Sequence, residues 1–256
     1  MSTADRSSPF DSLLEKLRKQ RGGKAASVDL PVIAWCADDR VLSTFIASFM
    51  LWDAPIARAA TALEALGASV IDANDLRVSL PEELLAIIGR SYPRGQERMT
   101  RLCAALNDVY RREHAVRLAH LKEKSKREAR AYLESLAHTP PFVAGRTFLL
   151  ALEGHAVPVD ERLLGRLLEI DAVGDESATP ESMSVAFERA IRAGSAAEAH
   201  ALLTSWADEP PNPTPSASRR SRSTRKAAAA GNGERKARQP VASAKKRSPA
   251  RRTRRR

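Results

Sequence analysis

The sequence predicts an all-α protein followed by a basic tail. Between Val28 and Asp208, apolar residues recur at spacings of three and four, which is the period of an amphipathic helix. Capping residues, early prolines and terminal glycines separate these periodic segments. Only Ala156 to Val159 has an extended pattern. From Pro210 onward, aromatic and large aliphatic residues are absent except for Val241, so the helical core ends there.

The N-terminal 27 residues are polar and mixed in charge, and we interpret residues 1–27 as a flexible segment. Phe10 to Arg18 has the spacing of a short amphipathic helix, but the Arg-Gly-Gly-Lys sequence that follows is typical of a linker. We therefore expect the folded domain to span residues 28–208. A chain of 256 residues is long enough to hold such a core.

The first helices of the core surround an almost continuous apolar run from Val41 to Leu51. A helix that is apolar on every side is normally central to a helical domain. Ile56 to Leu66 is the next predicted helix. For the residues between them, the simpler interpretation makes Trp52 a core residue and Asp53 the cap of the following helix.

Two more helices are predicted before residue 115. A loop from Asn74 leads into a helix that ends at Gly89, because a serine cap, a first-turn proline and two acids mark its start. Gln96 to His114 is a long helix with an apolar stripe. Its four arginines are interpreted as a solvated face: Arg98, Arg101, Arg111 and Arg112.

The stretch from Lys126 to Arg166 is the most informative part of the sequence. Residues 126–137 have one apolar face, and His138-Thr139-Pro140-Pro141 must end that helix because proline lacks an amide donor and disfavours a helical residue before it. The elements that follow are a second helix at about 143–152, a short extended piece, and Asp160 before a helix at 161–169. Helices at 180–192 and 195–207 complete the core.

The positive charge is concentrated in the tail. The chain has a formal net charge of +11, yet the segment from Pro211 to Arg256 holds 16 Lys and Arg against one acid, Glu234. The remaining residues are therefore slightly acidic. We interpret residues 209–256 as a disordered tail, because such a composition cannot bury enough apolar area to fold. Its cations favour nucleic acid through counterion release, whereas a solubilising tail or an acidic protein partner is the alternative.

Several classes of protein are excluded by the sequence. It contains no run of about 18 or more apolar residues and no signal-peptide pattern, so we expect no membrane partner. Cys36 and Cys103 are too few for a disulfide framework or a four-cysteine metal site. There is no P-loop, dinucleotide fingerprint or nucleophile elbow. We expect no cofactor, no metal, a monomer, and a cytoplasmic (nucleoid) location.

The order of features between Lys126 and Arg166 resembles the helix-hairpin-helix DNA glycosylase superfamily, which includes endonuclease III. In this family a Leu-Pro-Gly-Val-Gly hairpin precedes a helix and a Pro-Val-Asp or Ala-Val-Asp loop. Val157-Pro158-Val159-Asp160 matches that loop, and we interpret Thr139 to Ala144 as the hairpin. The resemblance extends over residues 28–208. It implies a two-lobed helical fold with the helix-hairpin-helix motif at about 126–153, and DNA as the partner.

The resemblance also implies which residues form the site. Asp160 matches the catalytic aspartate. The two hairpin glycines fall on Phe142 and Ala144, and the catalytic lysine of bifunctional members falls on Arg146, which cannot form a Schiff base. The implied hairpin contacts to DNA are Phe142, Val143, Ala144, Gly145 and Arg146. Endonuclease III holds an iron–sulfur cluster on four cysteines after the aspartate helix, and this chain has no cysteine there, so we expect no cluster.

Two other groups of residues complete the expected DNA interface. In the family, a glutamine inserts toward the gap left by the extruded base; Asp53 falls on that glutamine, and Trp52 beside it is suited to stacking on bases. This is the second interpretation of these two residues. In the tail, we expect phosphate contacts from Arg219, Arg220, Arg222, Arg225, Lys226, Lys245, Lys246, Arg247, Arg251 and Arg252.

Two functions stay open at this point. The first is a monofunctional DNA glycosylase of base-excision repair, in which Asp160 supports hydrolysis of the base–sugar bond without lyase activity. The second is a catalytically inactive DNA-binding or nucleoid-associated protein that uses the same fold and a histone-like tail. In that case Asp160 only caps the helix that starts at Glu161. The sequence does not name the base that would be removed.

Overall fold

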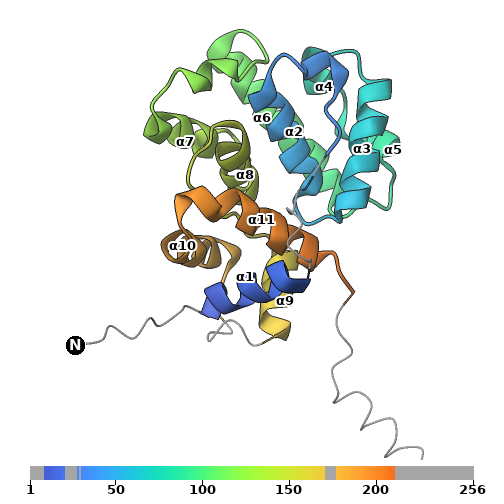
Figure 1. Cartoon of the computed structure of the whole chain (residues 1–256). Helices are drawn as coiled ribbons and strands as arrows, with labels where there is room; N and C mark the ends of the chain where they lie inside the picture. Colours follow the sequence, from blue (N-terminus) through green and yellow to red (C-terminus); the bar gives the residue numbers. More distant parts are fainter. Residues whose placement is uncertain (1–8, 21–27, 29, 171–176, 211–256) are drawn as a thin grey trace, which may run out of the picture. The chain divides into compact units, whose positions relative to one another are not determined.

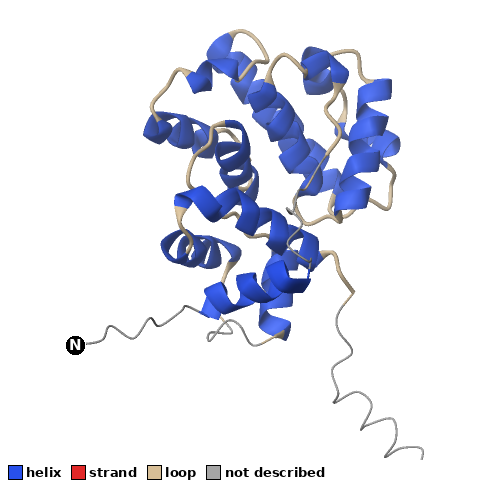
Figure 2. Ribbon diagram, in the orientation of Figure 1, coloured by secondary structure: helices blue, strands red, loops and turns tan. Residues whose placement is uncertain are grey.

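A computed structural model describes residues 9–20, 28, 30–170 and 177–210 of the chain. Within these ranges there are eleven α-helices, two short 3-10 helices and no strand, which confirms the all-α prediction (Figures 1 and 2). The helices are α1 (Pro9–Gln20), α2 (Arg40–Leu51), α3 (Ile56–Ser69), α4 (Ala73–Val78), α5 (Pro81–Ile88), α6 (Gly95–Glu113), α7 (Lys126–Ser135), α8 (Pro141–Ala151), α9 (Glu161–Glu169), α10 (Pro180–Ala190) and α11 (Ala193–Ala207). The 3-10 helices are η1 (Ala34–Cys36) and η2 (Ala119–Lys122).

Helix α2 is the centre of a first lobe, which consists of α2 to α6. Most of its residues are buried, including Phe45 and Phe49, whose rings meet edge to face with centroids 5.2 Å apart. It packs against α3 and α6 within the lobe and against α8 outside it. The prediction of a central apolar helix is therefore confirmed.

The second lobe consists of α1 and α7 to α11. Helix α8 packs against α7 and α11, and α9 packs against α10 and α11. Helix α1 also belongs to this lobe, because Leu13, Leu14 and Leu17 are buried against its neighbours and the Phe10 ring lies 4.5 Å from that of Phe187. The expectation that the core begins near Val28 is wrong, since the apolar stripe of α1 packs on α10 and α11 (Figure 1).

A second difference from the prediction is α4, which forms where a loop was expected. Asp72 caps it by accepting a hydrogen bond from the Asp75 N–H at 2.7 Å. The helix has only six residues and one fully buried side chain, Leu76. So short a segment shows little periodicity in the sequence, and its cap and its packing on α6 stabilise it instead.

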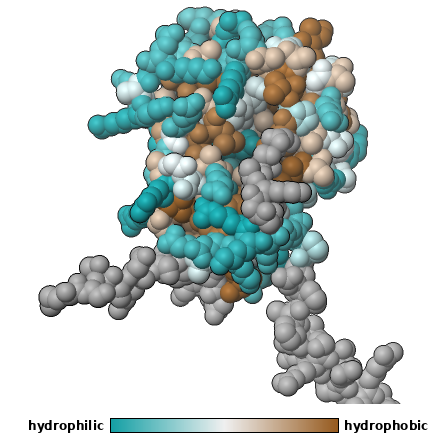
Figure 3. Space-filling view, in the orientation of Figure 1, coloured by the Kyte–Doolittle hydropathy of each residue, from teal (hydrophilic) through white to brown (hydrophobic). Residues whose placement is uncertain are grey.

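The apolar side chains gather inside the two lobes. The face shown in Figure 3 is largely hydrophilic, with smaller hydrophobic areas scattered across it. None of the helices in the described ranges has the length and apolarity needed to cross a bilayer.

Candidate active site

The turn between α7 and α8 spans Leu136 to Pro140. Its middle residue, His138, has a φ of +57°, in the left-handed region where glycine is favoured. Pro140 precedes the helix and Pro141 is its first residue, a position that suits proline because the missing N–H has no helical partner there. The prediction that placed the turn at Thr139 to Ala144 is wrong for this reason: the second proline starts the helix.

The five residues assigned as hairpin contacts lie inside α8. Phe142, Val143, Ala144 and Arg146 are buried, so their side chains are not presented to a DNA phosphate. Gly145 packs against Pro158, where an added Cβ would lie 3.3 Å from the Pro158 Cβ. The Arg146 guanidinium points toward α2 and donates to Ser48 Oγ at 3.1 Å.

Asp160 stands at the N-terminus of α9, as the sequence predicts. Its backbone is extended and its carboxylate caps the helix, with Oδ1 accepting from the Leu163 N–H at 2.9 Å. Oδ2 accepts from the Asp53 N–H of the first lobe at 3.1 Å. The side chain is 7% exposed. Asp160 is therefore both a helix cap and part of the contact between the lobes.

Asp53 in turn accepts a hydrogen bond from the start of α9. Its Oδ1 accepts from the Glu161 N–H at 2.9 Å, and its Oδ2 accepts from Arg94 at 2.6 Å. Because Asp53 has a left-handed backbone, with a φ of +52°, both its N–H and its carboxylate face α9. The simpler interpretation, in which Asp53 caps the helix that follows it, is wrong. Asp208 takes this role by accepting from the Ile56 N–H at 2.7 Å.

The environment of Asp160 makes its carboxylate a weaker acid than usual. Burial raises the pKa of Asp160 to about 6, and the nearby charge of Asp53 acts in the same direction, while the Leu163 N–H opposes it. A carboxylate with a pKa near 6 is mostly ionised at neutral pH and is still basic enough to accept a proton. General bases in enzymes are tuned in this way.

Trp52 lies beside Asp53 and is 7% exposed. Its indole ring faces a group of arginines, with the Arg94 and Arg101 guanidinium carbons 4.3 Å and 5.4 Å from the ring centroid. Such cation–π contacts hold the ring in place. Trp52 thus forms part of a wall and does not protrude as a wedge.

Arg98 holds the end of α2 on which Trp52 sits. It is fully buried and donates to the backbone carbonyls of Phe49, Trp52 and Pro93. The last carbonyls of a helix have no helical partner, so the guanidinium satisfies them. Burial lowers the pKa of Arg98 to about 10. The prediction of a solvated arginine face is wrong for this residue, because its donors are needed inside the core.

These groups surround a pocket of about 260 Å³ where the two lobes meet. The first lobe contributes Trp52, Arg94 and Arg101, and the second contributes Asp160 and Phe142, whose ring lies 6.0 Å from that of His200. Pro140, Pro141, Val159, Glu161, Pro180 and Glu181 complete the lining. Sequence reasoning missed Arg94 and Arg101 as site residues, since only the packing of α6 against α2 brings them to this pocket.

The described residues thus have the class of fold found in helix-hairpin-helix DNA glycosylases: two helical lobes, a helix–turn–helix, and an aspartate at the start of the next helix. The resemblance predicted this fold, and solved structures confirm it. No protein-family model matches the sequence, and a search of curated proteins finds no match.

Several solved structures share the fold, and two of them illustrate the similarity. One is the H. pylori 3-methyladenine DNA glycosylase MagIII bound to 1,N6-ethenoadenine, with a TM-score of 0.56 and 14% identity over 78% of this chain and 96% of that one. The other is MBOgg1 in complex with a low-affinity DNA ligand, with a TM-score of 0.54 and 17% identity over 77% of this chain and 66% of that one. The expected phosphate contacts at Arg219 to Arg252 lie outside the described residues.

Proposed function

We propose that this protein is a monofunctional DNA glycosylase that hydrolyses the bond between a base and its sugar. The observation that carries the proposal is Asp160: a buried carboxylate with a pKa raised to about 6, on the wall of a pocket between two lobes. Trp52 lines the same pocket, and its indole ring is suited to contact with the flat face of a flipped base. The fold shared with DNA glycosylases supports the same proposal.

In the proposed reaction, the bond between C1′ and the base nitrogen breaks and the base leaves with the bonding electron pair. The sugar develops positive charge, which the ionised Asp160 stabilises. A water molecule then bonds to C1′ and transfers a proton to the Asp160 carboxylate, while the departing base gains a proton from solvent. Each Asp160 oxygen accepts a hydrogen bond from one backbone N–H, and its second lone pair is available to accept the proton from water.

The turn supports the absence of lyase activity. With the left-handed His138 in the place of the first hairpin glycine, the family's catalytic lysine, four residues further on, corresponds to Phe142. Phe142 does line the pocket with Asp160, and a phenyl ring has no amine with which to form a Schiff base. In this register, DNA phosphate contacts belong to the turn at 136–140 and to the basic tail.

The test is release of free base from duplexes that carry a panel of damaged or mismatched bases. We expect the intact protein to release at least one of them, at a rate that rises with pH through about 6 as Asp160 ionises. Asp160→Asn should abolish release. The matched control is Asp39→Asn, because Asp39 is also a buried aspartate that caps a helix but lies outside the pocket; it should keep the activity.

The second candidate function is a DNA-binding protein without catalysis. One observation favours it: both Asp160 oxygens are engaged by backbone N–H groups, as in a purely structural cap. The same assay separates the two functions. If neither the intact protein nor Asp160→Asn releases any base, while both bind duplex with a strong salt dependence, the glycosylase proposal is refuted.

A further inference from the structure

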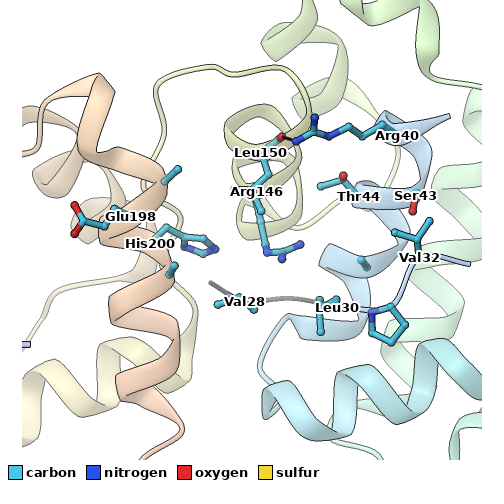
Figure 4. Close-up of a pocket in the computed structure, with 14 residues that line it drawn as sticks. Val28, Leu30, Val32, Arg40, Ser43, Thr44, Arg146, Leu150, Glu198 and His200 are labelled. Carbon is cyan, nitrogen blue, oxygen red and sulfur yellow. Dashed lines mark hydrogen bonds between the residues drawn. The ribbon is translucent and has the colours of Figure 1, made fainter. Parts of the chain in front are cut away.

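A second pocket, unrelated to the candidate active site, lies at the other end of the contact between α2 and α8. It has a volume of about 490 Å³, and none of its lining residues borders the Asp160 pocket. Helix α11 closes one side, and residues Leu30 to Val32 lie on another (Figure 4). The Arg146 guanidinium points into this space from α8.

Arg146 is a buried cation without an ionic partner among the described residues. It is 3% exposed, its one hydrogen bond there is to the neutral Ser48 hydroxyl, and its Nε has no acceptor. Glu198, which also lines the pocket, is paired with Arg18 at 2.8 Å. Burying an unpaired charge is costly, and such charges are normally compensated by an anion.

The neighbouring His200 does not supply that anion. It is 1% exposed, and burial together with the Arg146 charge lowers its pKa to about 3, so it is neutral at neutral pH. Burial lowers the pKa of Arg146 only to about 10, so this side chain stays charged. The pocket therefore presents a positive charge at its base.

The remaining walls are mainly apolar. The hydroxyls of Ser43 and Thr44 and the stem of Arg40 lie at one edge, and Arg40 itself donates to the Leu150 carbonyl at 3.0 Å. The apolar lining residues are Val28, Leu30, Pro31, Val32, Ala47, Leu150, Ala197 and Ala201. A hydrated inorganic anion would gain nothing from these walls, whereas an apolar body would bury its surface there.

We propose that this pocket binds a small organic monocarboxylate with an apolar body. The carboxylate would accept two parallel hydrogen bonds from the Arg146 guanidinium, a geometry that suits this pair of groups. The apolar body would lie against α11 and the segment at 30–32. This site is independent of the proposed glycosylase reaction, because it shares no residue with the Asp160 pocket.

Benzoate binding to the full chain tests the proposal. Calorimetry measures the affinity, and thermal unfolding measures the change in Tm. We expect saturable binding and a rise in Tm, and no such effect from benzamide, which has the same shape without the charge. Arg146→Met should weaken benzoate binding roughly 10–100-fold, the contribution of hydrogen bonds to a charged group. Ala197→Trp is a second variant, since this exposed residue lines the pocket and a larger side chain there should block it without removing a core contact.

Three results would overturn the proposal. The first is no binding of benzoate to the intact protein. The second is binding of inorganic phosphate as tight as that of benzoate, which would show that the apolar walls do not select the ligand. The third concerns Asp29, which lies outside the described residues but between Val28 and Leu30 in the sequence. If only Asp29→Asn binds benzoate, a carboxylate of the chain itself occupies the site.

Discussion

Two aspartates of this protein have the same structural task, and the comparison shows what is unusual about Asp160. Asp39 caps α2 and accepts three backbone N–H groups, from Leu42, Leu118 and Ala119. Asp160 caps α9 with comparable burial but accepts only two, and it lies beside the second carboxylate of Asp53. Its charge is thus less well compensated, which a cap selected for stability alone does not require.

Because the charge of Asp160 is poorly compensated, a substitution that removes this charge should stabilise the fold. The raised pKa of Asp160 means that its protonated form favours the folded state; this contribution is present below about pH 4 and is lost as the pH rises through about 6. Asparagine is an equally good cap and carries no charge, but its amide can accept from Leu163 only, so the hydrogen bond from the Asp53 N–H is lost. Removing the charge outweighs this loss, so Asp160→Asn should raise the free energy of unfolding at about pH 8 by roughly 1–2 kcal/mol, and should not raise it at about pH 4. Urea unfolding at both pH values measures this.

Asp39→Asn serves as the control for that experiment. It removes a charge that three N–H groups stabilise, so it should lower the free energy of unfolding at about pH 8 by about 1–3 kcal/mol. If Asp160→Asn destabilises the protein to the same degree, burial does not disfavour the charged form of Asp160. The raised pKa of Asp160 would then give no support to a functional role.

The position of Asp160 at the start of a helix could be predicted from the sequence, whereas its contacts with the first lobe could not. The Val-Pro-Val-Asp pattern places a carboxylate at a helix start, because capping and proline rules act over a few residues. The role of Asp53 depends on a contact with a segment more than a hundred residues away. The role of Arg98 could not be predicted from the sequence either. Its position on a helix does not indicate that its guanidinium donates to three backbone carbonyls in the core.

The turn between α7 and α8 precedes the segment of α8 that borders the pocket. Phe142, the second residue of α8, is one of the lining residues, and the turn has a left-handed residue at His138. Non-glycine residues at positive φ often mark functional sites. Asp53 and Arg94, which have φ values of +52° and +51°, contribute to the Asp160 site in the same conformation.

The left-handed turn residue predicts the effect of a glycine substitution. His138→Gly should raise the free energy of unfolding by about 1 kcal/mol relative to His138→Ala, because glycine adopts this conformation without a steric penalty. Thermal unfolding of the two variants measures the difference. At the neighbouring Ala137, which does not have a positive φ, the change to glycine should destabilise the protein instead. Equal Tm values for all three variants would contradict a conformational requirement at His138.

Helix existence was easier to predict than helix boundaries. The long apolar stripes of α2, α3, α6 and α7 determine those helices, because burial of one face dominates their energetics. The start of α8 was misplaced by two residues, since two consecutive prolines leave open which of them is the first helical residue. In the proposed register the position of the first hairpin glycine moves by four residues, from Phe142 to His138, so the position of the family's lysine moves from Arg146 to Phe142.

The two parts of the chain differ in charge. The core is slightly acidic, and the segment 211–256 carries 16 of the 42 Lys and Arg residues. Under the proposed function, we expect attraction to a polyanion to depend on the tail and selection of a base to depend on the pocket. We expect the two properties to be separable by truncation.

Deletion of residues 211–256 should remove most of the affinity for undamaged duplex and flatten its dependence on salt concentration, because fewer counterions are released on binding. Fluorescence anisotropy at several salt concentrations measures both quantities. A tail of the same length with its Lys and Arg replaced by Gln is the matched control, and it should behave like the deletion. Binding and salt slope that stay unchanged in the truncated protein would refute a DNA-binding tail.

The exchange of hydrogen bonds between Asp53 and the start of α9 has a consequence for observing motion. The Asp53 and Glu161 amide protons are each held by a carboxylate of the opposite lobe, so neither can exchange with solvent until the lobes part. In hydrogen–deuterium exchange these two amides should gain deuterium together, at a common rate. Their common rate would report how often the two lobes separate at this contact.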